Sequence, residues 1–271
     1  MIKLFLGVLV VLVILYLVVG WLLPKYNRKL YSLNYREASI NEGGGIDLFG
    51  NHIPKIIIQT WKTHDIPNNY KSDVNSLKKL NPDFEYKFFS DEEIVKFLKE
   101  FYPEYYKTYQ KLPIKIQKID FFRYIAVYHY GGFYFDLDIT GLFPLDEILN
   151  NQCVFPIDEF LSNHMCNHKR YKYYCDHGQT FLLGQYAFGA RPKDPFIKRL
   201  MNHIHSNIDT YVSMYEPGKP YENYVYKTTG PDFVTDIYMD YDDKSSVQIL
   251  EYDKRQYFGK YARHNYRGTW K

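Results

Sequence analysis

The sequence has little cysteine and little net charge. Only 3 of its 271 residues are cysteine, and the formal net charge is +3. So few cysteines leave room for one disulfide at most, with one thiol left over. No basic run of the kind that marks a nucleic-acid binder is present. We therefore expect no nucleic-acid partner.

The composition that remains is that of a folded protein. Apolar residues make up 46% and charged residues 24% of the chain, which is typical of globular domains. The length suits one α/β domain with a well-buried core, or at most two small domains. Aromatic residues reach 19%, with 29 tyrosines. Tyrosine suits sugar or nucleotide surfaces, although the same richness can follow from the base composition of a genome.

The three cysteines allow more than one interpretation. Cys166 and Cys175 lie in a stretch, HMCNH to CDH, that also carries histidines and an acid. A structural zinc site is less favoured there, because zinc ligands usually follow a tighter C-x-x-C spacing. One disulfide or three reduced thiols, with Cys153 as the third, both fit the sequence.

The only long apolar run is at the N-terminus. Leu4 to Leu23 carries no charge and, at about 1.5 Å per residue, spans roughly 30 Å as a helix, the thickness of a bilayer core. A cleaved signal peptide would normally have a shorter apolar core, followed by a small-x-small site. No such site is visible around Trp21, Leu22, Leu23, Pro24 and Lys25, so an uncleaved single-pass anchor is favoured.

This anchor divides the chain. We expect a short tail at 1–3, a transmembrane anchor at 4–23, a stem at 24–52 that includes the flexible NEGGG stretch, and a folded domain at 53–271. Only Lys3 precedes the apolar run, whereas several basic residues follow it. By the positive-inside rule alone, the folded domain would lie in the cytoplasm.

Strands and helices alternate through residues 54–138, which predicts an α/β layered domain with a largely parallel sheet. The Ser90–Glu93 stretch is a capping box that begins a helix. The expected strands are 55–60, 84–89 and 133–135, with a later one at 247–250. The expected helices are 72–80, the one after Ser90, the KIQKIDFFRYIAVYHYGG segment, 198–205 and 233–239.

The segment KIQKIDFFRYIAVYHYGG is the most informative one. Its apolar residues recur every three or four positions, and Gly131-Gly132 predicts the end of the helix. Asp120 and Arg123 lie three residues apart on one helix face, at the edge of its apolar side. We expect a partly buried ion pair that either stabilises the helix or points toward a ligand.

Asp136 and Asp138 follow the next predicted strand directly. Ligands of α/β sheets bind beyond the carboxyl ends of strands, so these acids are unlike ordinary solvated ones. An Asp-x-Asp pair at such a place can hold Mn²⁺ or Mg²⁺ against a diphosphate.

The same residues also match D-x-D-x-T, the first motif of haloacid-dehalogenase-type phosphatases. There Asp136 would be the nucleophile and Asp138 the acid and base, with Asp242-Asp243 as a later acidic motif. Against this interpretation, that motif usually follows the first strand of its domain, and no clear strand precedes Asp242.

Four stretches together resemble a known family. IPKIIIQTWK, KIDFFRYIAVYHYGGFYFDLD, TTGP and ARHNYRGTWK are similar to the glycosyltransferases of family 32, which share a DXD sugar-binding region. The resemblance covers roughly residues 52–271. It implies a glycosyltransferase-A fold, which is Rossmann-like and binds a nucleotide sugar, and a retaining transfer that depends on Mn²⁺ or Mg²⁺.

The resemblance also implies roles for individual residues. The implied metal ligands are Asp136, Asp138 and His264, of which the two acids are the catalytic centre. The implied donor contacts are Trp61, Asp120, Arg123, Tyr134, Thr269 and Trp270. Trp61 would stack on the base, and Thr269 and Trp270 would close over the β-phosphate. Gln185 and Asn223 are weaker candidates on the acceptor side.

The partners implied are a nucleotide-sugar donor, most simply GDP-mannose, a glycan or glycolipid acceptor, and a membrane bound through the N-terminal helix. The family implies a type II anchor with the domain in the Golgi or a comparable secretory compartment. This orientation is the opposite of the one that the charges flanking the apolar run predict. The alternatives left open are the phosphatase and a non-catalytic nucleotide-sugar binder.

Overall fold

A computed structural model describes residues 52–251 and 257–268. The expected tail and anchor, and all but the last residue of the expected stem, lie outside the described residues, as do Thr269 and Trp270. Within the two described ranges, no helix is long and apolar enough to cross a membrane.

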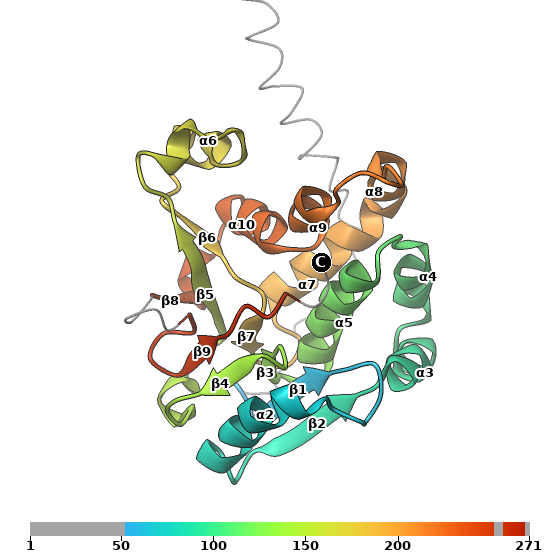
Figure 1. Ribbon diagram of the computed structural model, residues 1–271, viewed down its shortest axis with the longest axis vertical. Coiled ribbons are helices and arrows are strands. Elements are labelled where there is room, and N and C mark those ends of the chain that lie inside the picture. Colours follow the sequence, from blue (N-terminus) through green and yellow to red (C-terminus); the bar gives the residue numbers. More distant parts are fainter. Residues whose placement is uncertain (1–51, 252–256, 269–271) are drawn as a thin grey trace, which may run out of the picture. The chain divides into compact units, whose positions relative to one another are not determined.

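Strands and helices alternate along the first half of the described chain (Figure 1). The strands are β1 (Ile56–Thr60), β2 (Glu85–Phe89), β3 (Gly132–Phe135), β4 (Ile139–Gly141), β5 (Cys153–Phe160), β6 (Phe181–Leu183), β7 (Ala187–Ala190), β8 (Val247–Leu250) and β9 (Ala262–His264). The helices are α2 (Asn68–Leu80), α3 (Asp91–Phe101), α4 (Pro103–Lys111), α5 (Lys115–Tyr130), α6 (Lys169–Asp176), α7 (Pro195–Ser206), α8 (Ile208–Met214), α9 (Glu222–Thr228) and α10 (Pro231–Met239), with 3-10 turns at Asp146–Ile148, Met165–Asn167 and Lys244–Ser246.

The central sheet is mixed. Its strand order is β2-β1-β3-β7-β5-β6, with β8 paired to β5, and a separate pair joins β4 to β9. β1 runs parallel to β2 and β3, whereas β7 is antiparallel to both β3 and β5. The α/β class and the strands expected through Phe135 are confirmed. The sheet is parallel through β3, as predicted from residues 54–138, whereas beyond β3 it is mixed: β6 and β7 pair antiparallel, and β8 runs parallel to β5.

The antiparallel half arises where the chain turns back on β5. After the connection at 161–180, which carries α6, β6 and β7 together run back along β5. The pairing is interrupted between β6 and β7 at Gly184–Tyr186. A second irregularity lies between Ile157 and Glu159, where Asp158 is the additional residue of a β-bulge.

Side chains alternate between two apolar clusters, one on each face of the sheet. Ile57, Phe133 and Phe135 belong to one cluster, whereas Ile58 and Tyr134 belong to the other. This is the period-two alternation of strands whose two faces are both covered. One face packs against α5 and α7, and the other against α2 and the segment around β9.

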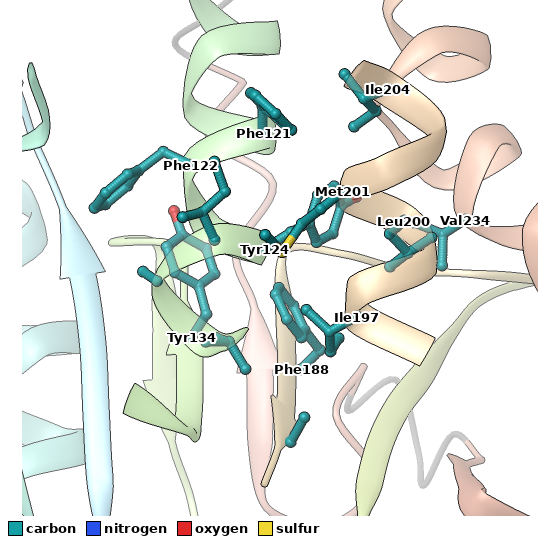
Figure 2. Packing of buried hydrophobic residues seen from close by; sticks show 14 of the residues in the cluster. Phe121, Phe122, Tyr124, Tyr134, Phe188, Ile197, Leu200, Met201, Ile204 and Val234 are labelled. Carbon is teal, nitrogen blue, oxygen red and sulfur yellow. The ribbon is translucent and has the colours of Figure 1, made fainter. Parts of the chain in front are cut away.

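The cluster on the α5 side is largely aromatic. Tyr124 of α5, Phe188 of β7 and Tyr134 of β3 gather beside the apolar side of α7 (Figure 2). Phe155 stacks on Phe188, with 4.9 Å between ring centroids. Rings of this size bury much apolar surface, and offset pairs add to the stability. α5 is therefore fixed against the sheet on which the acids stand.

The connection from α5 to β3 requires glycine. Gly131 and Gly132 have φ angles of 69° and 91°, a region that L side chains rarely adopt. The N–H of Gly131 donates to the carbonyl of Val127 at 2.8 Å and ends the helix. The predicted helix end is confirmed, as is the capping box, in which Ser90 and Glu93 bond reciprocally.

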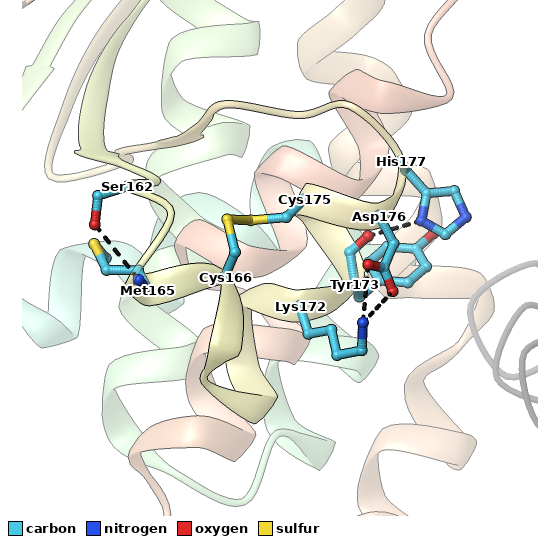
Figure 3. The surroundings of a disulfide bond; sticks show 8 residues. All are labelled: Ser162, Met165, Cys166, Lys172, Tyr173, Cys175, Asp176 and His177. Atoms are coloured by element: carbon cyan, nitrogen blue, oxygen red, sulfur yellow. Dashed lines mark hydrogen bonds and ion pairs between the residues drawn. A yellow bond between two sulfur atoms is a disulfide. The ribbon is translucent and has the colours of Figure 1, made fainter.

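A loop with a disulfide leaves the sheet between β5 and β6 and carries α6. Cys166 and Cys175 are bonded to each other (Figure 3), and Cys153 is a buried free thiol. The disulfide alternative is therefore confirmed, and a zinc site built from these cysteines is excluded. The loop contacts the rest of the domain through Arg170, whose guanidinium pairs with the buried Asp232.

The glycine requirement is testable at Gly132. A Cβ there would lie 2.6 Å from the carbonyl oxygen of Ile56, whereas Gly218 has a similar φ of 84° and open space around it. We expect Gly132→Ala to lower the free energy of unfolding by about 1–3 kcal/mol more than Gly218→Ala, because only the first adds a steric clash. Urea unfolding followed by circular dichroism measures both, and equal losses would contradict the clash.

Candidate functional site

Asp136 and Asp138 lie where β3 ends, at the edge of the sheet from which ligands of α/β domains are reached. The N–H of Asp136 donates to the carbonyl of Tyr186 at 2.8 Å, and its own carbonyl accepts from the Gln59 side chain at 3.3 Å. Backbone contacts to both neighbouring strands thus fix where the first acid stands.

Arg123 is the centre of the polar network behind the acids. Its Nη2 lies 3.1 Å from Oδ1 of Asp120 and 3.1 Å from Oδ1 of Asp136, and its Nη1 donates to the carbonyl of Gln185 at 2.9 Å. Its side chain is only 2% exposed. Burial opposes the charge of Arg123, but the carboxylates of Asp136 and Asp120 raise its pKa, and of the two Asp136 contributes more. The guanidinium therefore stays charged.

Asp120 is held in the interior by this pair. Thr229 donates to its Oδ2 at 2.8 Å, and Gln185 lies 3.5 Å from its Oδ1. Burial raises the pKa of Asp120 to about 6, and the opposing attraction of Arg123 and the hydrogen bond from Thr229 limit the rise. The predicted ion pair of α5 is confirmed and lies deeper than expected.

Asp136 reaches from this network to the surface. Its side chain is 30% exposed, and the hydroxyl of Tyr134 donates to its Oδ1 at 2.8 Å. Arg123 also lies over the Tyr134 ring, 4.6 Å from the centroid. Burial raises the pKa of Asp136, opposed by Arg123, and the charge of Asp138 raises it further. Tyr134 thus positions the acid.

Asp138 faces the C-terminal segment. Its Oδ2 lies 3.4 Å from Nε2 of His264 and accepts from the backbone N–H of Arg267 at 3.0 Å. Burial works against ionisation, but the hydrogen bond and charge of His264 and the N–H of Arg267 together lower the pKa of Asp138. The Asp138 carboxyl is therefore ionised near neutral pH, and it can bind a cation or accept a hydrogen bond.

His264 packs against two tyrosine rings, which also lie near each other. Tyr186 stacks on it with 4.3 Å between centroids, and Tyr266 lies against it at 4.0 Å. Its Nδ1 is buried and has no hydrogen-bond partner among the described residues. A buried, unsatisfied ring nitrogen beside a carboxylate is suited to a ligand that the protein itself does not supply.

Asp136, Asp138 and His264 are the candidate ligands of a divalent metal. Across residues 52–251 and 257–268, no three His, Cys, Asp or Glu side chains are gathered closely enough to hold an ion. Asp138 and His264 already lie together, whereas Oδ1 of Asp136 is bonded to Arg123 and Tyr134. Two carboxylates and an imidazole are ligand types that suit Mn²⁺ or Mg²⁺. Because the three side chains are not gathered around one point, the role of Asp136, Asp138 and His264 as metal ligands stays a prediction.

The other predicted site residues differ in whether they contact the acids and the Arg123 network. Trp61 follows β1, is partly buried, and packs in one cluster with Tyr70 and with Leu137, which lies between the two acids. Gln185 belongs to the Arg123 network, whereas Asn223 is exposed on α9 and none of the described contacts joins it to the acids. Stacking of Trp61 on a base stays a prediction.

Some residues of the site gave no local signal in the sequence. Asp73 of α2 accepts from Thr140 at 2.6 Å and from the guanidinium of Arg267 at 2.7 Å. Asn265 donates to the carbonyl of Asp138 and to Thr140. Only the TTGP stretch, which contains Thr229, and the ARHNYRG stretch marked parts of this network beforehand.

The phosphatase interpretation is not favoured. Asp136 follows the third strand of the described domain rather than its first. Asp242 and Asp243 come after α10 and precede a 3-10 turn, so the second acidic motif is not at a strand end.

Comparison with known proteins supports the resemblance seen in the sequence. Residues 67–155 match the model of a family described as a glycosyltransferase sugar-binding region containing a DXD motif. This segment begins just before α2 and includes α5, β3 and both acids. The match therefore falls on the part of the chain that builds the Arg123 network.

Curated relatives match over part of the chain. Inositol phosphoceramide mannosyltransferase 3 of Schizosaccharomyces pombe is 35% identical over 126 residues, which is 45% of this chain and 35% of that protein. Inositol phosphoceramide mannosyltransferase 1 of the same yeast is 28% identical over 194 residues, 68% of this chain and 50% of its own length. The chain thus spans half or less of each relative.

Among solved structures, mouse xyloside xylosyltransferase 1 is 12% identical and aligns with a TM-score of 0.46, over 80% of this chain and 98% of the other. This likeness is too low to carry an inference about function.

The buried ion pair gives a stability prediction. Asp120→Ala leaves the Arg123 charge with one carboxylate fewer in the interior, and we expect it to lower the free energy of unfolding by about 3–5 kcal/mol. Adding Arg123→Met should recover part of the loss, because the unpaired charge is then removed. Urea titration measures both variants.

The matched control is the exposed pair of Lys111 and Asp209. There, Asp209→Ala should cost at most about 1 kcal/mol. Strictly additive losses for Asp120→Ala and Arg123→Met would show that the two side chains do not act together.

Proposed function

We propose that the chain is a membrane-anchored, metal-dependent retaining glycosyltransferase with a glycosyltransferase-A fold. It moves a hexose from a nucleotide sugar to a glycan or glycolipid acceptor. The observation that carries this proposal is the position of Asp136 and Asp138 at the end of β3, linked through Arg123 to Asp120, inside the segment that matches the DXD family.

The arrangement suits recognition of a nucleotide sugar. Arg123 is a fixed, buried cation behind the acids, and Asp120 and Gln185 add polar groups on the same side. Trp61 stands at the end of the neighbouring strand, where an aromatic ring would stack on a base. Asp120 and Arg123 are thus proposed to contact the ribose and the sugar.

The proposed reaction breaks the bond between the anomeric carbon and the diphosphate oxygen. The acceptor oxygen bonds to that carbon on the same face, and its proton passes to the departing diphosphate. Asp136, Asp138 and His264 are the proposed metal ligands, and a bound Mn²⁺ or Mg²⁺ supplies positive charge to the leaving group. Tyr134 and Arg123 keep Asp136 in position.

Mannose is the proposed sugar, with GDP-mannose as its donor, because two relatives are named as mannosyltransferases. Their names also include inositol phosphoceramide, which supports a glycolipid or glycan acceptor here. We further propose a type II anchor at 4–23, with the domain in the Golgi or a comparable compartment. The disulfide of Cys166 and Cys175 supports an oxidising compartment.

The activity test uses the full chain in detergent, with a panel of nucleotide sugars and Mn²⁺. We expect release of nucleotide from at least one donor, loss of that activity with EDTA, and its recovery when Mn²⁺ is restored. Binding of a donor without any turnover would favour the non-catalytic binder instead. A phosphoenzyme on Asp136 and release of phosphate from simple monoesters would favour the phosphatase.

Asp138→Asn tests the site itself. We expect turnover to fall by at least about a hundredfold, because the proposed metal loses a charged ligand and its positive charge is held less well at the leaving group, with the melting temperature nearly unchanged. Asp209→Asn, at an exposed ion pair far along the chain, serves as the control. Full activity of Asp138→Asn would remove this acid from the proposed metal site.

A further inference from the structure

A closed ring of hydrogen bonds holds the second acid from the side of α2. The Thr140 hydroxyl donates to Oδ1 of Asp73 at 2.6 Å and accepts from Nδ2 of Asn265 at 2.9 Å. The same Nδ2 donates to the Asp138 carbonyl at 2.9 Å, and the N–H of Arg267 donates to Oδ2 of Asp138 at 3.0 Å. Nη2 of Arg267 lies 2.7 Å from Oδ2 of Asp73 and closes the ring. Three segments far apart in the sequence are thus joined around Asp138.

Asp73 is the fixed point of this ring. It belongs to α2, which packs against β4 (Figure 1), and the residue is only 4% exposed. Thr140 donates to one of its carboxylate oxygens and Arg267 to the other. A buried carboxylate that loses such partners keeps the cost of its lost hydration. Asp73 therefore holds both β4 and the turn after β9, residues 265–267, in place.

The turn after β9 needs such an anchor. Tyr266, in its middle, has a φ of 48°, in the left-handed region that residues with a Cβ rarely adopt. Such a conformation persists only where the surrounding structure fixes it. Arg267 supplies part of this fixation, because its guanidinium also donates to the carbonyl of Asn69 and lies over the Tyr70 ring, 5.2 Å from the centroid. The turn is thus held by α2 rather than by its own backbone preference.

The link from the ring to the Asp138 carboxylate is a backbone group. Oδ2 of Asp138 accepts from the N–H of Arg267, and the Asp138 carbonyl accepts from the N–H of Asn265 at 3.0 Å. A side-chain substitution leaves both N–H groups in the chain, and whether they reach Asp138 depends on where the turn lies. A change at Asp73 or Thr140 therefore acts on this carboxylate through the position of the turn.

We propose that Asp73 and Thr140 are positioning residues for the transfer reaction. Through the turn after β9 they direct the Asp138 carboxylate toward the place of the leaving diphosphate, and neither of them touches the donor. This inference rests on the proposed glycosyltransferase function and adds to it two residues outside the proposed donor site.

The first experiment measures nucleotide release by the full chain, with Mn²⁺ and a donor from the panel that wild type turns over. Thr140→Val keeps the β-branched shape that suits β4 and removes the hydroxyl. We expect it to lower turnover about tenfold or more, because a small displacement of a group at the reacting centre costs much of the rate. Asp73→Ala should do the same. Thr140→Ser keeps the hydroxyl and should stay near the wild-type value, whereas equal turnover of the serine and valine variants would contradict the proposal.

A double-mutant cycle separates positioning from a structural effect. In the Asp138→Asn background the carboxylate charge is absent, so its direction no longer matters. There, Thr140→Val should lower the remaining turnover by no more than about twofold. The same factor in both backgrounds would show that Thr140 does not act through Asp138, and it would overturn the inference.

Asp194→Ala controls for a loss of stability. Asp194 is also a buried acid, 1% exposed, and accepts from the N–H groups of Phe196 and Ile197 at the start of α7. It follows the end of β7 that pairs with Gly132, which is the end of β3 away from the acids. We expect this variant to lower the melting temperature, because a helix cap is lost, and to leave the turnover of the folded protein unchanged. A loss of turnover comparable to that of Asp73→Ala would contradict a special role of Asp73.

Hydrogen exchange tests the ring without any donor. It stays decisive if no donor is turned over, an outcome that rejects the proposed function alone. Deuterium uptake of the full chain is read at single amides by mass spectrometry, with the Gly131 amide, bonded to Val127 at the other end of β3, as the internal reference. We expect Thr140→Val and Asp73→Ala to speed exchange of the Arg267 amide about tenfold or more relative to this reference, as for a lost hydrogen bond to a charged group. Thr140→Ser should keep the wild-type ratio, and an unchanged ratio in Thr140→Val would show that the ring does not hold the turn.

Discussion

The site depends on one buried cation. Arg123 joins Asp120 on its own helix, Asp136 at the end of β3 and the backbone of Gln185 between β6 and β7. A guanidinium in the interior is tolerated only when carboxylates and carbonyls compensate for its lost hydration. The three segments must therefore meet at Arg123, and the acids are fixed as a consequence.

This requirement explains irregularities of the sheet. Gly131 and Gly132 turn α5 directly into β3, so that the helix carrying Arg123 lies over the strand carrying Asp136. The pairing to β5 is interrupted at Gly184–Tyr186, and there the Gln185 carbonyl accepts from Arg123. The Tyr186 carbonyl still accepts from the N–H of Asp136, one residue beyond the pairs of β3 and β7.

The C-terminal segment completes the site from outside the main sheet. β9 pairs with β4, which begins directly after Asp138, and this pairing brings His264 opposite Ile139. Arg267 then reaches Asp73 of α2, and its backbone N–H reaches Asp138. The two acids differ as a result: Asp136 is held by the core network, whereas Asp138 is held by the last described segment of the chain.

The sequence by itself determined the elements up to Phe135 apart from α4. It also determined the end of α5 at a double glycine, the ion pair of Asp120 and Arg123, and the position of both acids at a strand end. These follow from local periodicity, caps and short spacing, which act within a few residues. The relation of His264 to the acids came from a family resemblance, which no local pattern could supply, whereas the contact of Thr229 with Asp120 is known from the structure alone.

Only the tertiary structure decided the rest: the antiparallel pairing of β6 and β7 with β5, the bulge at Asp158, the pairing of Cys166 with Cys175, and the network of Asp73, Thr140 and Arg267. Asp73 and Arg267 meet because two sheets and a helix are packed together, and nothing near either residue in the sequence encodes that contact. Local preferences fix where strands and helices begin and end, whereas burial of shared apolar faces fixes which of them become neighbours.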